Sequence, residues 1–357
     1  MAQEPSLIPV EDTVQLRDTV DYIETVQLSD GLIPWYDGGT ADPWDHVESA
    51  MALSIGGRYD AARKAYEWMA QNQLADGSWW AAYDDDGRPA DRTRETHRTA
   101  YVATGVWHHY LITGDQDFLR SMWPTVKRAI FFAINHQTQH GEIHWAIDED
   151  GHVDRDALLT GCSSIYKSLE CALNIARTIN RDWDGWAFAR KRLGRAIRNK
   201  PGRFDRTWES KDRYSMNWFY PVLCGIYSGV QAQLRMSRYW NQFVESELGC
   251  RCVADEPWVT VAETSELILA LEATGNHQEA LRLYDWLHQW KDDDGGYWTG
   301  YQIEDDSIWP EEKPTWTAAA VLLAADALSD TTPASKLFSP YSMLSSATSR
   351  GGDFRHE

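Results

Sequence analysis

Carboxyl groups and aromatic rings alternate closely in residues 292–316 of this 357-residue chain. Eight acids lie there: Asp292, Asp293, Asp294, Glu304, Asp305, Asp306, Glu311 and Glu312. Between them lie Tyr297, Trp298, Tyr301, Trp309 and Trp316. Aromatic rings stack on the apolar faces of sugars, while carboxyl groups bind hydroxyls or transfer protons. The mixture favours a carbohydrate site, although a solvated acidic loop above a few buried rings has the same composition.

Similar aromatic loops recur along the chain and strengthen the carbohydrate interpretation. The chain has 19 Trp, several times the usual number for its length. The earlier loops carry Trp35 with Tyr36, Trp79 with Trp80, Trp145, Trp208 and Trp258. If these loops meet at one end of the fold, their rings and acids line a single cleft.

Twelve segments with helical periodicity supply the elements that would position these loops. Long loops alternate with short turns between the segments, which is typical of repeated helical hairpins. Segments after long loops are apolar or small, as in SAMALSIG, whereas those before them are amphipathic. We therefore predict an all-α fold, an (α/α)6 barrel of six hairpins with the long loops on one rim. An open helical solenoid is the alternative.

The element boundaries define one domain and a tail. Residues 1–328 form the predicted toroid, and residues 329–357, rich in Ser, Thr, Pro and Gly, form an irregular C-terminal tail. Within the toroid, the pattern predicts a helix over 217–236 followed by a short helix near 238–248.

Charge and missing motifs exclude several classes of function. The net charge of −20 argues against nucleic acid and against anionic membranes. No apolar run is long enough for membrane insertion, and no basic and apolar leader opens the chain, so we expect a cytoplasmic protein. The five Cys show no disulfide or zinc spacing and read as reduced thiols. Phosphate loops, a nucleophile elbow and H-E-x-x-H are absent, so we expect neither a cofactor nor a metal.

Acids near the starts of the apolar helices are candidates for substrate binding. Asp45 and His46 open the first of these helices, but Asp42 as N-cap would make Asp45 part of a capping box. Glu95 and His97 open the second, where Glu95 could instead balance the helix dipole. Thr260 and Glu263 also fit a capping box, which favours a structural role for Glu263.

The remaining substrate-binding candidates come from the loops themselves. They are Trp35, Trp79, Trp80 and Trp145, then Glu209, Asp212, Tyr214 and Trp218 of the fourth loop, Glu256 and Trp258 of the fifth, and Trp298 and Tyr301 of the sixth.

Several stretches resemble the glucoamylase-like inverting glycosidases of the six-hairpin superfamily. PWDHVESAMAL is similar to their W-x-R-D segment, which implies that Asp45 binds a sugar. QNQLADGSWWAAYDDDG and PTWTAAAVLLAADAL resemble two further segments. The catalytic carboxyls do not carry over, because Ala146 and Ile147 follow Trp145 where the family has W-E-E. Tyr301 and Gln302 stand where it has E-Q. We therefore expect acid and base elsewhere, with Glu149 and Glu311 or Glu312 as the catalytic candidates.

QLADGSW at Gln73 also resembles the Q-x-x-x-G-x-W repeat of squalene-cyclase and prenyltransferase-like helical barrels. Their protonating D-x-D-D and diphosphate-binding D-D-x-x-D motifs are absent here. Because such repeats stabilise hairpins, they indicate the fold more than the reaction.

The sequence favours an inverting glycoside hydrolase acting on an α-linked oligosaccharide or polysaccharide. Such an enzyme holds its two carboxyl groups about 6.5–9.5 Å apart so that water fits between them. A terpene-cyclase or prenyltransferase-like enzyme and a non-catalytic sugar-binding barrel are the alternatives.

Overall fold

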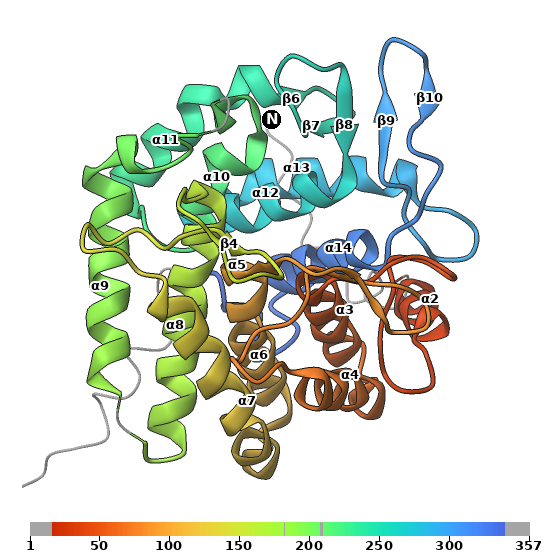
Figure 1. The fold of residues 1–357 in the computed structure, drawn as a ribbon. Helices are drawn as coiled ribbons and strands as arrows, with labels where there is room; N and C mark the ends of the chain where they lie inside the picture. The colour runs from red at the N-terminus through yellow and green to blue at the C-terminus, as the bar shows by residue number, and fades with distance from the viewer. Residues whose placement is uncertain (1–15, 182, 208–209, 340–357) are drawn as a thin grey trace, which may run out of the picture.

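The protein is a closed barrel of helical hairpins, seen here in a computed structural model that describes residues 16–181, 183–207 and 210–339. Six inner helices follow one another around the ring, and the last packs against the first (Figure 1). They are α3 (Pro43–Ile55), α5 (Thr96–Ala100) continued by α6 (Val102–Thr113), α8 (Leu159–Thr178), α10 (Ser215–Leu223), α12 (Val261–Thr274) and α14 (Thr315–Ser329). The predicted (α/α)6 barrel is confirmed, and the open solenoid is excluded.

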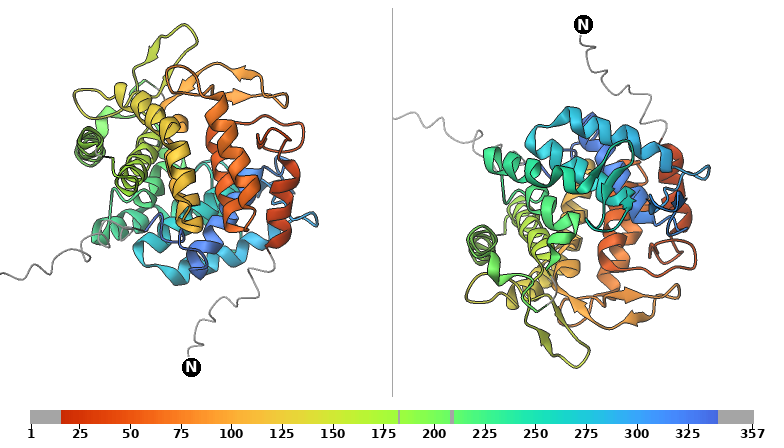
Figure 2. Two further views of the ribbon diagram at one scale, coloured as in Figure 1. Left: turned by 90° about the horizontal axis from the view of Figure 1, so that it is seen from below. Right: turned by 90° about the horizontal axis from the view of Figure 1, so that it is seen from above.

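Six outer helices surround this ring, and all but α2 follow an inner helix after a short turn. They are α2 (Arg17–Val26), α4 (Tyr59–Asn72), α7 (Gln116–Asn135), α9 (Asp184–Asn199), α11 (Gly229–Phe243) and α13 (His277–Leu287). In Figure 2 the chain circles once, from red α2 to blue α14, which returns beside it. Inner helices are covered on nearly every side, as in residues 261–271 of α12, whereas outer helices bury one face.

A glutamine and a glycine four residues later join each of three hairpins to the next outer helix. The Gln73 amide donates to the carbonyls of Gly77 (2.8 Å) and Thr125 (3.0 Å). Gln27 and Gln137 make the same pair of bonds to their own glycine and to α4 or α9. Gly77 has φ +95°, and a Cβ there would lie 2.5 Å from a carbonyl of α7. The Q-x-x-x-G repeat is therefore a device of the fold, as predicted.

The rim loops contain short antiparallel strands that the sequence did not predict. Five of them form one sheet, in the order β10 (Ser307–Ile308), β9 (Gly300–Gln302), β8 (Trp258–Thr260), β7 (Gly249–Arg251) and β6 (Val244–Glu245). A second sheet joins β3 (Arg94–Glu95), β4 (Ala146–Ile147) and β5 (Val153–Asp154), and β1 (Ala82–Tyr83) pairs with β2 (Pro89–Asp91). Strands of two or three residues are too short to show periodicity. They connect neighbouring loops and fix the rim.

The predicted helices over 217–236 and 238–248 were wrong in their boundaries. The chain leaves α10 after Leu223, turns through Gly225 at φ +76°, and starts α11 at Gly229. Pro221 has no backbone N–H to donate, and the left-handed conformation of Gly225 produces the turn that ends the helix. Helix α11 then runs to Phe243, where β6 begins.

The described part of the tail, residues 330–339, is irregular but packs against the base of the barrel. Leu337 and Phe338 are buried. The Lys167 ammonium donates to the Leu337 carbonyl at 3.1 Å and to the Glu170 carboxylate at 3.0 Å. Three short 3-10 helices complete the described elements: η1 (Pro201–Arg203), η2 (Lys211–Arg213) and η3 (His288–Trp290). All five cysteines are free thiols, as predicted.

Candidate active site

Three carboxyl groups follow one another along the first two turns of inner helix α3. Asp42 is the N-cap, accepting from the backbone N–H groups of Trp44 (2.8 Å) and Asp45 (3.1 Å) and from the Trp35 indole (3.2 Å). Asp45 lies in the first turn and is half-buried. Glu48, one turn deeper, is buried and accepts a 2.9 Å hydrogen bond from the Trp44 indole.

The surroundings of Asp45 and Glu48 favour protonated carboxyl groups. Burial, and then the charge of Asp42, raise the pKa of Asp45 well above its usual range, and Arg98 opposes the shift. Burial raises the pKa of Glu48 to about 7. A carboxyl that keeps its proton near neutral pH can act as a general acid.

Helix α5 brings a carboxylate, an imidazole and a guanidinium beside α3. Glu95 is buried and forms an ion pair with Arg98, whose Nε lies 3.0 Å from its carboxylate, and His97 Nε2 lies 3.3 Å from the same carboxylate. Burial and the neighbouring Arg98 lower the pKa of His97 to about 3, so its imidazole is neutral. A neutral imidazole can donate and accept hydrogen bonds with uncharged hydroxyls.

Helix α12 adds two further acids, separated from α3 in the ring by α14. Glu263 lies in the first turn and Glu266 one turn deeper, and both are buried. Burial and the charges of Glu48 and Glu263 raise the pKa of Glu266, which also hydrogen-bonds to Tyr220. The Cys252 thiol hydrogen-bonds to Glu263. Thr260 starts the helix without a side-chain capping bond, so the predicted capping box does not form.

Aromatic rings from α3, from α10 and from the junction of α5 and α6 lie among these acids. Trp44 stacks on Tyr101 with centroids 4.3 Å apart and planes 9° apart. The ring centroid of Tyr220 lies 5.8 Å from that of Trp44, and the ring centroid of His97 lies 5.6 Å from that of Trp44. Protonated carboxyls beside rings, with a further acid on α12, can bind an uncharged sugar and transfer protons to and from it.

The structure places the predicted aromatic residues in different surroundings. Trp35, Trp80, Trp145, Trp258, Trp298 and Tyr301 are half-buried on the rim. Trp79 is buried and donates to the Met69 carbonyl at 3.0 Å. Trp218 is buried, stacked on Phe243 with centroids 5.4 Å apart.

The acids predicted as catalytic lie on the outer parts of the rim loops. Glu149 is exposed, with Arg92 3.8 Å away. Glu311 is exposed as well. Glu312 is half-buried, and the Tyr36 hydroxyl lies 3.5 Å from its carboxylate. Asp42, Asp45, Glu48, Glu263 and Glu266 lie deeper, in the inner helices.

The other predicted binding residues are dispersed. His46 is buried, and its ring nitrogens contact the Ile33 N–H (3.0 Å) and the Ala65 carbonyl (2.9 Å). Glu256 is exposed, 3.6 Å from Arg213. Asp212 and Tyr214 lie on the fourth loop at the protein surface. Glu209 lies outside the described residues.

Glu48, Glu266, Arg98 and Tyr101 were not predicted from the sequence, because the predicted candidates came from the loops and from acids and histidines at the helix starts. A usable signal was present. Carboxyls repeat at a spacing of three in an otherwise small and apolar helix, at Asp42, Asp45 and Glu48, and ionisable groups in such a helix rarely occur without a function.

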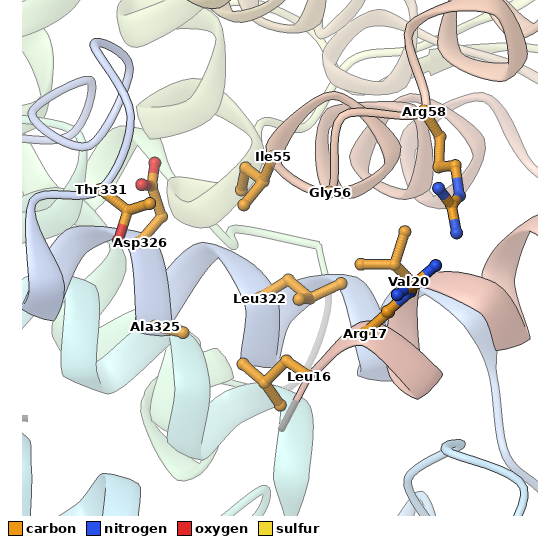
Figure 3. Close-up of a pocket in the computed structure, with 10 residues that line it drawn as sticks. All are labelled: Leu16, Arg17, Val20, Ile55, Gly56, Arg58, Leu322, Ala325, Asp326 and Thr331. Carbon is orange, nitrogen blue, oxygen red and sulfur yellow. The ribbon is translucent and has the colours of Figure 1, made fainter. Parts of the chain in front are cut away.

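A hollow of about 340 Å³ lies at the end of the barrel opposite the long loops, on the side of the short turns (Figure 3). Leu16, Val20, Ile55 and Leu322 line it, and Arg58 and Asp326 lie at its edges. Its lining includes none of the candidate acids of α3 and α12, so this hollow is separate from the candidate site.

Among residues 16–181, 183–207 and 210–339, no group of three His, Cys, Asp or Glu side chains is placed to hold a metal ion. In the same ranges, no helix combines the length and apolarity that crossing a membrane requires.

Known proteins resemble this chain in sequence and in fold. No protein-family profile matches it. An MMP endo-(1,4)-3-O-methyl-alpha-D-mannosidase from Mycolicibacterium hassiacum is 48% identical over 324 residues, which are 91% of this chain and 89% of the relative. A glycosidase solved in complex with glucose superposes with a TM-score of 0.71 at 15% identity, over 90% of this chain and 99% of that one. A D-mannose isomerase superposes with a TM-score of 0.66 at 13% identity, over 90% and 100%.

Proposed function

Because this chain belongs to the glycoside hydrolase family of the endo-(1,4)-3-O-methyl-alpha-D-mannosidase, we propose that it cleaves internal α-(1,4) bonds in a chain of 3-O-methylmannose. The observation that carries the proposal is the pair of acid sets on α3 and α12, with Trp44 and Tyr101 between the inner helices. The terpene-cyclase and non-catalytic alternatives have no comparable support.

We propose Asp45 as the general acid. It is half-buried at the start of α3, and burial and Asp42 raise its pKa, so it holds a proton for the departing glycosidic oxygen. Glu263, in the first turn of α12, is the proposed base. It would take a proton from the attacking water, and attack opposite the departing oxygen inverts the anomeric carbon.

The rim supplies groups suited to a methylated sugar. O-Methyl groups and sugar faces are apolar, and the half-buried Trp145 and Trp258 offer flat apolar surface. His97 and Arg98 offer hydrogen bonds near Asp45. Glu149, Glu311 and Glu312 remain rim alternatives for the acid or the base, to be distinguished by substitution.

We also propose a cytoplasmic location, supported by the five free thiols, since disulfides are rare in that reducing compartment.

The test is hydrolysis of purified α-(1,4)-linked 3-O-methylmannose oligosaccharides, followed by release of reducing ends and by product length. Unmethylated α-(1,4)-mannan oligosaccharides and α-(1,4)-glucans serve as comparison substrates. Internal cleavage of the methylated chain supports the proposal. Failure to cleave it, or stepwise release of single sugars from one end, would overturn it.

A further inference from the structure

Two hollows that share lining residues lie around the fourth rim loop, and one of them is also lined by the third loop. One, of about 410 Å³, is lined by Trp145, Thr160, Tyr214 and Met216. The other, of about 490 Å³, extends outward past Arg235 and Tyr239. Leu159, Asp205 and Asn217 line both, and together the two hollows are called the distal pocket. Each falls in the range of about 300–1,000 Å³ that is typical of small-molecule sites.

The distal pocket begins next to the start of α5. Trp145 lies on its wall, and the Trp145 carbonyl accepts from the Thr96 N–H at 2.9 Å. Thr160 precedes Gly161, where a Cβ would lie 3.1 Å from the His97 ring. The wall of the pocket therefore lies against Thr96 and His97, on the α5 side of the candidate active site.

The walls of the pocket hold polar atoms that the protein leaves unused. Asn217 is 5% exposed, and its Nδ2 donates to Asp212 at 2.9 Å. Within the described residues, its Oδ1 is buried without a hydrogen-bond partner, as is Asp205 Oδ1. Buried acceptors without partners are costly, and a ligand hydroxyl would satisfy them.

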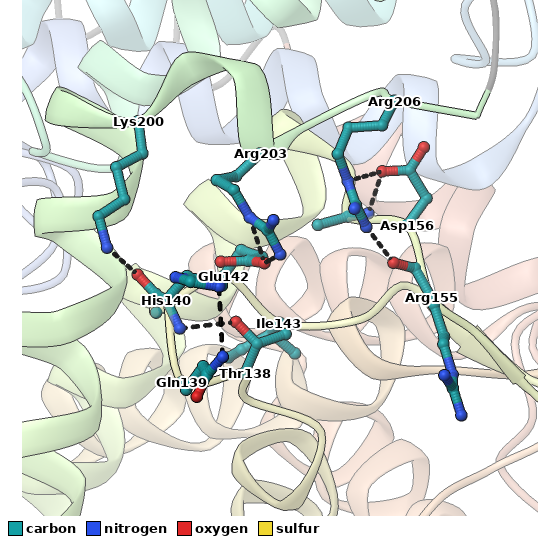
Figure 4. Close-up of polar contacts among 12 residues, drawn as sticks. Thr138, Gln139, His140, Glu142, Ile143, Arg155, Asp156, Lys200, Arg203 and Arg206 are labelled. Carbon is teal, nitrogen blue, oxygen red and sulfur yellow. Dashed lines mark hydrogen bonds and ion pairs between the residues drawn. The ribbon is translucent and has the colours of Figure 1, made fainter.

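Charged contacts hold the two loops rigidly against each other (Figure 4). The buried Glu142 accepts from Arg203 Nε at 2.8 Å, and Lys200 donates to the His140 carbonyl at 2.8 Å. Arg206 lies 3.5 Å from the buried Asp156. Because these pairs fix the walls before a ligand arrives, binding in the pocket would need little ordering of the loops.

We infer that the distal pocket is a sugar-binding subsite, which takes neutral, O-methylated residues of the polysaccharide on one side of the bond being cleaved. The inference rests on the proposed function. Trp145, Tyr214 and Met216 would contact the methyl groups and sugar faces, while Asn217 would receive a hydroxyl donor. An endo-acting enzyme needs such sites, because it binds its substrate in the interior of the chain.

The test compares α-(1,4)-linked 3-O-methylmannose oligosaccharides of increasing length. For each protein, kcat/KM is measured on the longest and on the shortest oligosaccharide that is cleaved. We expect Tyr214→Ala to lower the ratio of long to short roughly tenfold, and Asn217→Ser to lower it in the same direction. Phe188→Ala is the matched control, an exposed ring on α9 that leaves the ratio unchanged.

An unchanged ratio in both pocket variants would overturn the inference, as would equal losses at every length. If the wild-type protein cleaves none of these sugars, the proposed function fails separately. The pocket is then tested by calorimetric titration with the longest oligosaccharide. A Kd that is the same for wild type and Tyr214→Ala, or no binding by either, would overturn the inference, and a roughly tenfold weaker Kd in the variant would support it.

Discussion

The carboxylate of Asp42 accepts a 3.1 Å hydrogen bond from the backbone N–H of Asp45, so two acids share the first turn of α3. Capping the helix places the charge of Asp42 beside the Asp45 carboxyl, and that charge adds to burial in raising the pKa of Asp45. The same aspartate thus starts the inner helix and keeps the proposed acid protonated.

This relationship predicts a shift in the pH dependence of activity. A general acid must be protonated, so activity falls as pH rises through the pKa of Asp45. Asp42→Asn removes the neighbouring charge and keeps a good N-cap. The pKa of Asp45 then falls, and the alkaline limb of the kcat/KM profile moves to lower pH. If the alkaline limb of the Asp42→Asn profile does not move, Asp45 is not the general acid.

Substitution of the proposed acid and base should be far more damaging than substitution of the rim acids. We expect Asp45→Asn and Glu263→Gln to lower kcat roughly 10²–10⁴-fold, the usual contribution of acid–base catalysis. Glu149→Gln, Glu311→Gln and Glu312→Gln should change it only a few-fold. Thermal unfolding checks that all five variants fold. A large loss from a rim variant, with Asp45→Asn fully active, would reverse the assignment.

Glu48 should make stability depend on pH. Burial raises its pKa from 4.5 in the unfolded chain to about 7 in the folded protein. The protonated Glu48 therefore makes its full contribution to the free energy of unfolding below pH 4.5, and this contribution is lost as pH rises through 7. Glu48→Gln removes that loss while keeping an acceptor for Trp44.

We expect Glu48→Gln to raise the unfolding free energy at pH 8 by on the order of 1–3 kcal/mol relative to its effect at pH 5. Denaturant unfolding at the two pH values measures this. An equal effect at both would mean that Glu48 is ionised in the folded protein throughout.

Two glycines with similar backbone conformations should respond differently to alanine. Gly77 (φ +95°) would place a Cβ 2.5 Å from the Arg128 carbonyl, whereas Gly87 (φ +74°) has open space, with its nearest atoms 4.0 Å away. Gly87→Ala should cost about 1 kcal/mol from the left-handed conformation alone, and Gly77→Ala at least about 3 kcal/mol. Chemical unfolding of both variants measures the difference, and equal costs would count against close packing of the Q-x-x-x-G repeat.

The helical framework was predictable because its signals are local and repeated. The alternation of apolar and amphipathic segments, and the Gln73 to Gly77 spacing, follow from the closed ring and its packing. The break before Gly229 was not predictable in the same way, since Pro221 does tolerate a helical position and only the turn at Gly225 shows where α10 ends.

The deep acids were less accessible from sequence. Asp45 and Glu263 were noticed as residues at helix starts, but a first-turn acid is ordinarily explained by capping or by the helix dipole. Glu48 and Glu266 lie on different helices far apart in the chain, and only ring closure brings their charges within reach of each other. The proximity of these two acids depends on the tertiary fold, so the spacing of residues along one helix could not predict it.

The most direct test of the account is the anomeric form of the first product. A 3-O-methylmannose oligosaccharide is incubated with the wild-type protein, and anomeric protons are followed by NMR before mutarotation. The account predicts internal cleavage with the β-anomer appearing first, and no such signal with Asp45→Asn. First appearance of the α-anomer, or unchanged cleavage by Asp45→Asn, would contradict it.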